Sequence, residues 1–239
     1  RQQFPALKDV PCEVEAIVKG GSDRQFYRFT WAAADQPPMV LMIYTLARRD
    51  NPKFVPSTHR LAALGVNVPA IYAFDEQRLL VWLQDLGRDD LHAHHEEPWE
   101  LRRPLYEATL KEAAKIHAVA ESSLAAEEVA AMEPEFNEGM YEWEQNYFIE
   151  HFVQGFLNRD VKDLSSAHEA LAQLRQKLGQ LPRCLVHRDF QSQNVIMRDG
   201  AAWLVDYQGL RPGLAEYDLA SLLFDPYVKI SRSERGEML

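Results

Sequence analysis

In the stretch CLVHRDFQSQNVIMRDGAAWLVDYQG, residues 184–209, three of the oxygen-bearing side chains have a spacing that could serve chemistry: Asp189, Asn194 and Asp206. Mg²⁺ prefers oxygen ligands, and few protein ligands suffice because phosphates and waters complete its octahedron. Phosphoryl transfer needs such a metal site and a further carboxylate that orients the attacking hydroxyl. The three side chains therefore indicate a phosphoryl-transfer centre. The alternative is a polar turn between two buried strands.

The residues around these side chains predict a β-hairpin. Short apolar runs flank the polar loop, and Asp199-Gly200 is typical of a two-residue hairpin turn. The expected strands cover residues 184–186, 195–197 and 201–205. Such a hairpin would bring the loop 187–194 and Asp206 to the same end, so that the three oxygen-bearing side chains surround one point.

The first part of the chain is predicted to form a small antiparallel sheet with one helix on it. Five segments have the alternation or the aromatic content of strands: 13–19, 25–31, 39–44, 70–74 and 78–83. Between the third and the fourth, Asn51 is the expected helix N-cap and Pro52 the first helical residue. This helix should end at Gly65, since glycine is common just after a helix.

The apolar pattern breaks between Gln84 and Asp90, and helical patterns dominate afterwards. We therefore expect an α+β chain with two lobes. Residues 1–84 would form the first lobe, 85–90 a linker, and 91–239 a second, mainly helical lobe. The expected helices of the second lobe cover residues 104–122, 138–157 and 165–178.

The bulk composition narrows the class of protein. The chain has 239 residues with a net charge of −10, which argues against a nucleic-acid surface because phosphate contacts need clustered Lys and Arg. Its two cysteines form no disulfide framework, no signal sequence opens the chain, and no apolar run approaches a membrane span. We expect a cytoplasmic protein. The start at Arg1 without Met is typical of a fragment or a trimmed chain.

The motifs of residues 184–209 resemble those of kinases. His187-Arg188-Asp189 with Asn194 matches the kinase catalytic loop, and Asp206-Tyr207-Gln208-Gly209 corresponds to the metal-binding Asp-Phe-Gly segment. In detail the chain resembles the aminoglycoside phosphotransferase family, which has the bilobal kinase-like fold and phosphorylates small molecules. HRDFQSQN, VDYQG and EYDLASLLFD are most similar to bacterial cell-wall-recycling kinases that phosphorylate the anomeric hydroxyl of N-acetylmuramate and N-acetylglucosamine.

This resemblance implies a role for each matching residue of the catalytic region. Asp189 would be the catalytic base that orients the acceptor hydroxyl. Asn194 and Asp206 would bind Mg²⁺. Three further residues would support the loop without touching the reacting groups: His187, Arg188 and Asp218.

The resemblance also implies an ATP site in the first lobe. GGSDRQFYRF is similar to the family's phosphate-covering hairpin and VWLQDLG to its hinge. Gly20, Gly21, Ser22 and Arg24 would lie over the phosphates, and backbone groups from Gln84 to Leu86 would hold adenine. Taken alone, the two glycines would be equally typical of an ordinary hairpin turn.

The acceptor is expected to be a sugar. EWEQNYFIEHF resembles the family's amino-sugar-side helix, which implies that Trp143, Glu144 and Asn146 contact the substrate. Sugars are commonly held by an aromatic face with polar partners, although core packing is the default role for aromatic side chains on such a helix.

The chain departs from the kinase pattern in its charges. That pattern has a Lys on the third strand paired with a Glu on the next helix, but residues 39–44 contain no Lys and 54–64 no Glu. The amino-sugar kinases that the chain resembles also lack this Lys. Gln191 replaces the Lys of protein kinases, which disfavours a protein substrate. Candidate replacement cations are Arg28, Arg48, Arg49, Lys53, His59 and Arg60.

Two alternatives stay open at this point. The same chemistry could serve another acceptor, namely an aminoglycoside, choline or homoserine. The missing Lys–Glu pair would also suit a nucleotide-binding pseudokinase without turnover.

Overall fold

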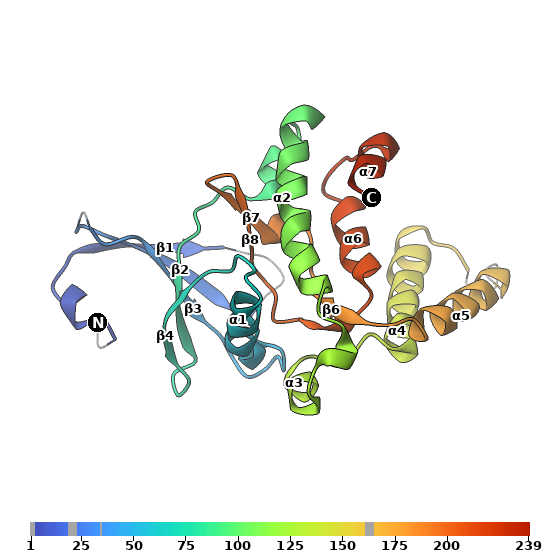
Figure 1. The fold of residues 1–239 in the computed structure, drawn as a ribbon, viewed down its shortest axis with the longest axis horizontal. Helices are drawn as coiled ribbons and strands as arrows, with labels where there is room; N and C mark the ends of the chain where they lie inside the picture. The colour runs from blue at the N-terminus through green and yellow to red at the C-terminus, as the bar shows by residue number, and fades with distance from the viewer. Residues whose placement is uncertain (1–2, 19–22, 34, 161–164) are drawn as a thin grey trace.

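The computed structural model describes residues 3–18, 23–33, 35–160 and 165–239. Its first lobe is a five-stranded antiparallel sheet in the order β1-β2-β3-β5-β4. The strands are β1 (Cys12–Ile17), β2 (Gln25–Trp31), β3 (Met39–Ile43), β4 (Ile71–Asp75) and β5 (Leu80–Gln84). Figure 1 shows this sheet on the left, with α1 against it and the helical lobe on the right. The predicted sheet is confirmed.

Helix α1 (Phe54–Ala63) follows a 3-10 turn at Asn51–Lys53. It ends at Gly65 as predicted: Gly65 has a φ of 72°, and Val66 N–H donates to the carbonyl of Leu61 at 3.0 Å. The predicted N-cap is wrong, because the Asn51 side chain makes no capping bond. Its amide donates instead to the Thr45 carbonyl at 2.9 Å and to Asp23 at 3.2 Å. Asn51 thus joins the segments before β2 and after β3.

The second lobe is mainly helical. Its long elements are α2 (Trp99–His117), α4 (Glu138–Phe148), a π-helical continuation at Ile149–Phe156, and α5 (Ser165–Gly179). Shorter ones are η3 (Leu91–His94), η4 (Glu121–Ser123), α3 (Ala126–Ala131), α6 (Ala215–Leu223) and α7 (Arg232–Met238). The helices predicted over 138–157 and 165–178 are confirmed. No helix in the described part of the chain could cross a membrane.

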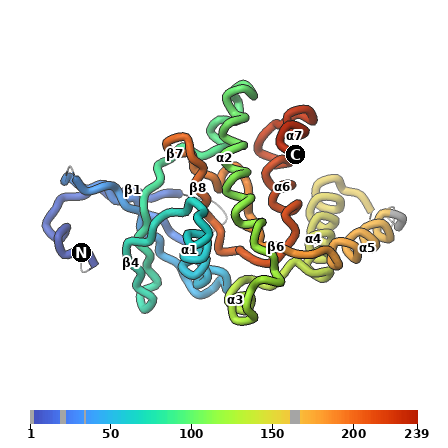
Figure 2. Tube along the Cα trace, in the orientation of Figure 1, coloured from blue at the N-terminus to red at the C-terminus, as the bar shows by residue number. Residues whose placement is uncertain are grey.

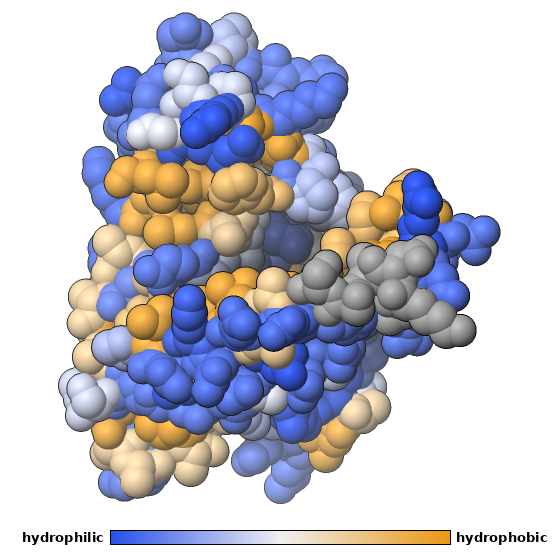
Figure 3. Space-filling view, turned by 90° about the vertical axis from the view of Figure 1, so that its right-hand side faces the viewer, coloured by the Kyte–Doolittle hydropathy of each residue, from blue (hydrophilic) through white to orange (hydrophobic). Residues whose placement is uncertain are grey.

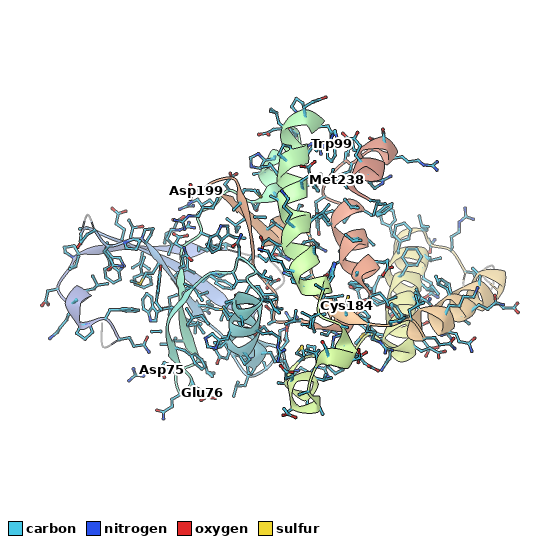
Figure 4. All side chains as sticks on the ribbon, in the orientation of Figure 1. Asp75, Glu76, Trp99, Cys184, Asp199 and Met238 are labelled. Atoms are coloured by element: carbon cyan, nitrogen blue, oxygen red, sulfur yellow. The ribbon has the colours of Figure 1, made fainter. Side chains whose placement is uncertain are left out.

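Helix α2 begins and ends earlier than predicted. Its buried face starts at Arg102, before the predicted first residue Pro104, and Arg102 is fixed by Glu234 and the Lys229 carbonyl of the α7 region. That burial stabilises a helical turn ahead of the proline. At the other end, Ala120 leaves the helix and pairs with Cys184. Figure 4 shows Trp99, at the start of α2, next to the α7 region, where its indole N–H donates to Glu237 at 3.1 Å.

Four short strands of the second lobe carry the loop 187–194. β7 (Val195–Arg198) and β8 (Ala201–Leu204) form the predicted hairpin, and β6 (Cys184–Val186) pairs with β9 (Arg211–Gly213). At the hairpin turn, labelled by Asp199 in Figure 4, Asp199 and Gly200 have φ values of 52° and 75°. This is the left-handed conformation that two-residue hairpin turns require. The tube in Figure 2 shows the hairpin between the sheet and α2.

One hydrophobic core runs through both lobes. It joins Met42 and Leu61 of the first lobe to Ile116, Leu185 and Leu204 of the second. A direct link comes from Tyr207, which follows Asp206: its ring stacks on Phe54 of α1 at 5.2 Å between centroids, and its hydroxyl lies 2.9 Å from the Thr58 hydroxyl. The segment after Asp206 is therefore packed against the helix of the first lobe.

Candidate active site

A cleft of about 790 Å³ lies between the sheet and the β7–β8 hairpin. Apolar side chains line it from above and below, namely Ile17, Val40, Ile196 and Val205. Gln84 and Leu86 line it at the connection between the lobes. The backbone N–H and C=O groups of Leu86 have no hydrogen-bond partner among the described residues. An apolar slot beside such groups can hold a planar heterocycle by its faces and its polar edge.

Asp218 holds the catalytic loop from below. Its side chain is fully buried and accepts hydrogen bonds from the backbone N–H groups of His187, at 2.7 Å, and Arg188, at 2.9 Å. His117 Nε2 lies 2.9 Å from the same carboxylate. Arg188 has a φ of 81°, which is uncommon for a residue other than glycine. Bonds to a buried carboxylate can hold the backbone in this conformation.

The imidazole of His187 is a packing group. The side chain is fully buried, and its ring lies 5.5 Å from the Phe190 ring and edge-on to Tyr207 at 6.3 Å. Neither ring nitrogen has a hydrogen-bond partner among the described residues. His187 therefore contributes shape to the loop.

Asp189 is half-buried. Its carboxylate accepts from the Arg188 guanidinium at 2.6 and 2.8 Å. Its backbone carbonyl accepts from Gln191 N–H and from the Asn194 amide, both at 2.9 Å. Burial alone would lower the pKa of Arg188, but Asp189 outweighs it and raises that pKa, so the guanidinium stays charged at neutral pH. The result is a carboxylate in a defined orientation, which a hydroxyl-orienting group needs.

Asn194 and Asp206 lie side by side at the polar end of the cleft. They are brought together by the hairpin, because Val205 N–H donates to the Asn194 carbonyl at 3.0 Å. The Asn194 amide nitrogen is used by Asp189, which leaves its amide oxygen as the possible ligand. Asp206 has a φ of 67°, a second uncommon backbone conformation at the site.

This donor set fits Mg²⁺. One carboxylate and one amide oxygen are enough when substrate phosphates and waters supply the other ligands. Within the described residues, no group of three or more His, Cys, Asp or Glu could hold a metal by itself. A metal ion at this site would therefore need phosphate and water oxygens as its remaining ligands.

Arg24 brings a positive charge to the same end of the cleft. It precedes β2, and its guanidinium pairs with Asp206 and donates to the Gln208 side chain at 2.7 Å. Gln208 in turn donates to Asp206 at 3.3 Å. The other residues expected over the phosphates, Gly20, Gly21 and Ser22, lie outside the described residues.

The replacement cations considered from the sequence lie elsewhere. Arg28 binds Asp85 and the Gly87 carbonyl at the hinge. Arg49 and Lys53 contact Glu133, at 2.9 and 2.7 Å. The remaining three do not line the cleft: Arg48 pairs with Asp50, Arg60 with Glu128, and His59 is exposed on α1.

The predicted substrate residues separate into two groups. Glu144 of α4 accepts a hydrogen bond from the Tyr217 hydroxyl of α6 at 3.0 Å, which holds it on the inner side of the helix. Trp143 and Asn146 are exposed, and the Trp143 ring lies 5.5 Å from the Tyr147 ring between centroids, tilted by 30°. No contact joins either of them to the catalytic loop within the described residues. Figure 3 views the α4 and α5 side of the molecule, where apolar side chains gather around a hollow.

Three residues of the site region were missed from the sequence. Tyr217 meets Glu144, and burial, then Glu144, raises its pKa, so its hydroxyl remains a donor at neutral pH. Asp225 accepts from the Ser192 N–H at 2.9 Å and steadies the loop near Asn194. Buried Glu133 links the lobes through Arg49 and Lys53. For Tyr217 a signal existed, since it directly precedes Asp218 in the EYDLASLLFD motif.

Comparisons with known proteins agree with this geometry. A family model described as the phosphotransferase enzyme family, APH, matches residues 13–238. A Pseudomonas aeruginosa N-acetylmuramate/N-acetylglucosamine kinase is 27% identical over 220 residues, covering 89% of this chain and 60% of that protein. The Neisseria meningitidis serogroup B protein of the same name is 32% identical over 167 residues, covering 69% of this chain and 48% of that protein. The chain thus spans less than two thirds of these relatives.

Solved structures show the same fold. Choline kinase LicA from Streptococcus pneumoniae superimposes with a TM-score of 0.65 at 16% identity, covering 100% of this chain and 76% of that one. The ADP-bound aminoglycoside phosphotransferase APH(2'')-Ib gives a TM-score of 0.64 at 13% identity, covering 100% and 79%. At these identities the likeness establishes a kinase-like α+β fold, as expected from the sequence.

Proposed function

Since the chain belongs to the phosphotransferase enzyme family, we propose that it is an ATP- and Mg²⁺-dependent kinase that phosphorylates a hydroxyl of a small molecule. The proposed acceptor is an N-acetylated amino sugar, and the proposed site of transfer is its anomeric hydroxyl. The observation that carries the proposal is that Asn194 and Asp206 line one cleft and that the Asn194 amide is bonded to the backbone carbonyl of Asp189.

The residues would divide the work by position. Asn194 and Asp206 would hold Mg²⁺, which supplies charge neutralisation for the transferred phosphoryl group when bound. The hinge backbone around Leu86 would hold the adenine edge. Asp189 would accept a hydrogen bond from the acceptor hydroxyl and take its proton as the phosphoryl group is transferred. Asp218, through the backbone of His187 and Arg188, would keep Asp189 in place.

Two features support an amino-sugar acceptor. Both curated relatives named above carry the name of N-acetylmuramate/N-acetylglucosamine kinases. Glu144 and Tyr217, which are bonded to each other, would offer the acceptor a carboxylate and a hydroxyl, and such groups pair readily with sugar hydroxyls. The proposed Tyr217 contribution adds a polar partner to the one expected from the sequence.

The test is ADP release by the purified protein with ATP and Mg²⁺. The acceptors are N-acetylmuramate, N-acetylglucosamine and, as matched controls, the methyl glycosides of the same sugars, in which the anomeric hydroxyl is blocked. We expect turnover with the free sugars and none with the glycosides. Turnover with both would contradict the anomeric site. Turnover only with kanamycin, choline or homoserine would replace the sugar by another acceptor of the same fold, and nucleotide binding without any turnover would indicate a pseudokinase.

A further inference from the structure

The phosphates of a nucleotide in this cleft need a compensating positive charge. In kinase-like sites that charge sits on the third strand, yet β3 has the sequence MVLMI and carries no cation. Val40 lines the cleft, and Met42, two residues later on the same face of the strand, is fully buried in the hydrophobic core. The third strand therefore contributes only apolar contacts.

The neighbouring strand offers the charge instead. Met42 lies opposite Phe26 in the β2–β3 register, and Phe26 lines the cleft together with Arg24, two residues earlier. Because side chains alternate along a strand, Arg24 and Phe26 approach the cleft from one face. The Arg24 side chain is only 6% exposed, and its guanidinium lies against Asp206 and Gln208.

The other described cations that line the cleft are held at its hinge end. Arg28 makes two bonds to Asp85, at 2.5 and 3.0 Å, and a third to the Gly87 carbonyl at 2.9 Å. Arg88 pairs with Glu15. Among the described residues, Arg24 is thus the cation placed beside the predicted metal ligands.

We propose that Arg24 replaces the third-strand Lys as the phosphate-binding cation, and that it exchanges its Asp206 partner for phosphate when the metal–nucleotide complex binds. This inference rests on the function proposed above and names the residue that completes it. It also bears on the pseudokinase alternative, because the missing charge would be supplied by the residue just before β2.

The exchange follows from the contacts of Asp206. One of its carboxylate oxygens accepts from both Arg24 and Gln208. A metal ion at that carboxylate would meet the guanidinium as a like charge, so metal and Arg24 compete for Asp206. Phosphate oxygens offer Arg24 a matching partner, since the guanidinium fork binds phosphate with two parallel hydrogen bonds. Arg24 would therefore weaken the binding of a metal ion without nucleotide, and it would strengthen the binding of the metal–nucleotide complex.

The test uses the opposite effects that Arg24 should have on the affinity for nucleotide and on the affinity for metal without nucleotide. In Arg24→Met, the affinity for ADP with Mg²⁺, measured by calorimetry, should fall about tenfold or more, because a charged hydrogen-bonding partner of the phosphates is lost. The affinity for Mn²⁺ without nucleotide, measured by electron paramagnetic resonance, should rise. Arg24→Lys should give an intermediate ADP affinity, because it keeps the charge but loses the fork. It also serves as the test variant if Arg24→Met fails to fold.

The control is Arg78→Met, which removes an arginine paired with Asp75 at the far end of the sheet. Both affinities should match the wild type. An unchanged ADP affinity in Arg24→Met would overturn the phosphate role, and an equal or weaker Mn²⁺ affinity would overturn the exchange. Wild-type protein that binds no nucleotide at all would sink the proposed function itself, which makes the two failures distinguishable.

Discussion

At the end of the cleft that we propose to bind the metal (the metal end), Arg24, Asp206 and Gln208 contact one another, and the Asn194 amide is fixed by Asp189. On the side that we propose to bind the acceptor (the acceptor side), Tyr217 donates to Glu144, while aromatic side chains of the same helical segment remain exposed. These form two rows with members four residues apart: Trp143, Tyr147 and His151, and Phe148, Phe152 and Phe156. The metal end is thus ordered by its own contacts, and the acceptor side presents an open surface.

This difference has a chemical meaning. Charge stabilisation during phosphoryl transfer depends on groups that are already oriented, so the metal end has to be built in advance. An acceptor pocket has to admit and release different molecules, and relatives of one fold can differ there while keeping the same chemistry. If this is correct, substitutions on the two sides should change different kinetic parameters.

The largest effect is expected from Asp189→Asn. The substitution keeps the size of the side chain but removes the proton acceptor for the hydroxyl, so kcat should fall about a thousandfold. ADP affinity should stay within about twofold of the wild type, because Asp189 lies on the acceptor side. Steady-state kinetics and calorimetry measure the two quantities. A comparable loss of ADP affinity would show that Asp189 belongs to the nucleotide end.

The matched control is Asp199→Asn at the other end of the same hairpin. This carboxylate is 91% exposed, and asparagine tolerates the left-handed conformation of the turn. Activity should be unchanged. The pair of variants therefore separates loss of one catalytic carboxylate from loss of any carboxylate in the hairpin.

The sequence predicts that Asn194 and Asp206 lie together, and the structure confirms this proximity, because the information that sets it is local. Turn chemistry at Asp199-Gly200 and the apolar runs on either side are enough to bring Asn194 next to Asp206. The partner of Asp206 is different: Arg24 lies 182 residues away, and no local pattern pairs them. The motif predicts Arg24 over the phosphates, but only the structure shows its contact with Asp206, the proposed metal ligand.

Long-range packing explains the other differences as well. The early start of α2 depends on Arg102, whose partners lie near the end of the chain at Lys229 and Glu234. Glu133 follows a short helix and is unremarkable in sequence, yet it is buried between cations of two lobes. Periodicity describes the faces of single elements, and it carries no information about which distant element will cover a polar group.

An intermediate effect is expected from Glu133→Gln. This substitution tests whether the ion pairs of Glu133 with Arg49 and Lys53 stabilise the contact between the two lobes. Burial raises the pKa of Glu133, but Lys53, Arg49 and Arg211 outweigh it and lower the pKa below its ordinary value of 4.5. A depressed carboxyl pKa adds stability above the unfolded-state value, and that stability is lost as the pH falls through the folded-state value. The variant should therefore lose about 2 kcal/mol at neutral pH.

Urea unfolding across an acidic pH series measures this effect. The difference between variant and wild type should shrink below the ordinary pKa of 4.5, where the wild-type carboxylate becomes protonated. Glu107→Gln is the control, since Glu107 forms an exposed pair with Arg103 on α2 and should contribute less than about 1 kcal/mol. A difference that stays constant into acid would mean that Glu133 acts through packing and not through its charge.

The smallest effect is expected from Tyr217→Phe, on the acceptor side. The ring and its contact with Phe136, at 4.4 Å between centroids, would be kept, and only the hydrogen bond to Glu144 would be lost. Loss of one such bond should raise the KM for the sugar by about threefold to tenfold, with the KM for ATP unchanged.

Tyr141→Phe is a closely matched control. Tyr141 packs on the same Phe136 ring at 5.5 Å, and its hydroxyl has no hydrogen-bond partner among the described residues. If both variants raised the KM for the sugar equally, packing around Phe136 would determine acceptor binding. If Tyr217→Phe raised the KM for ATP instead, Glu144 would have to be assigned to the nucleotide end.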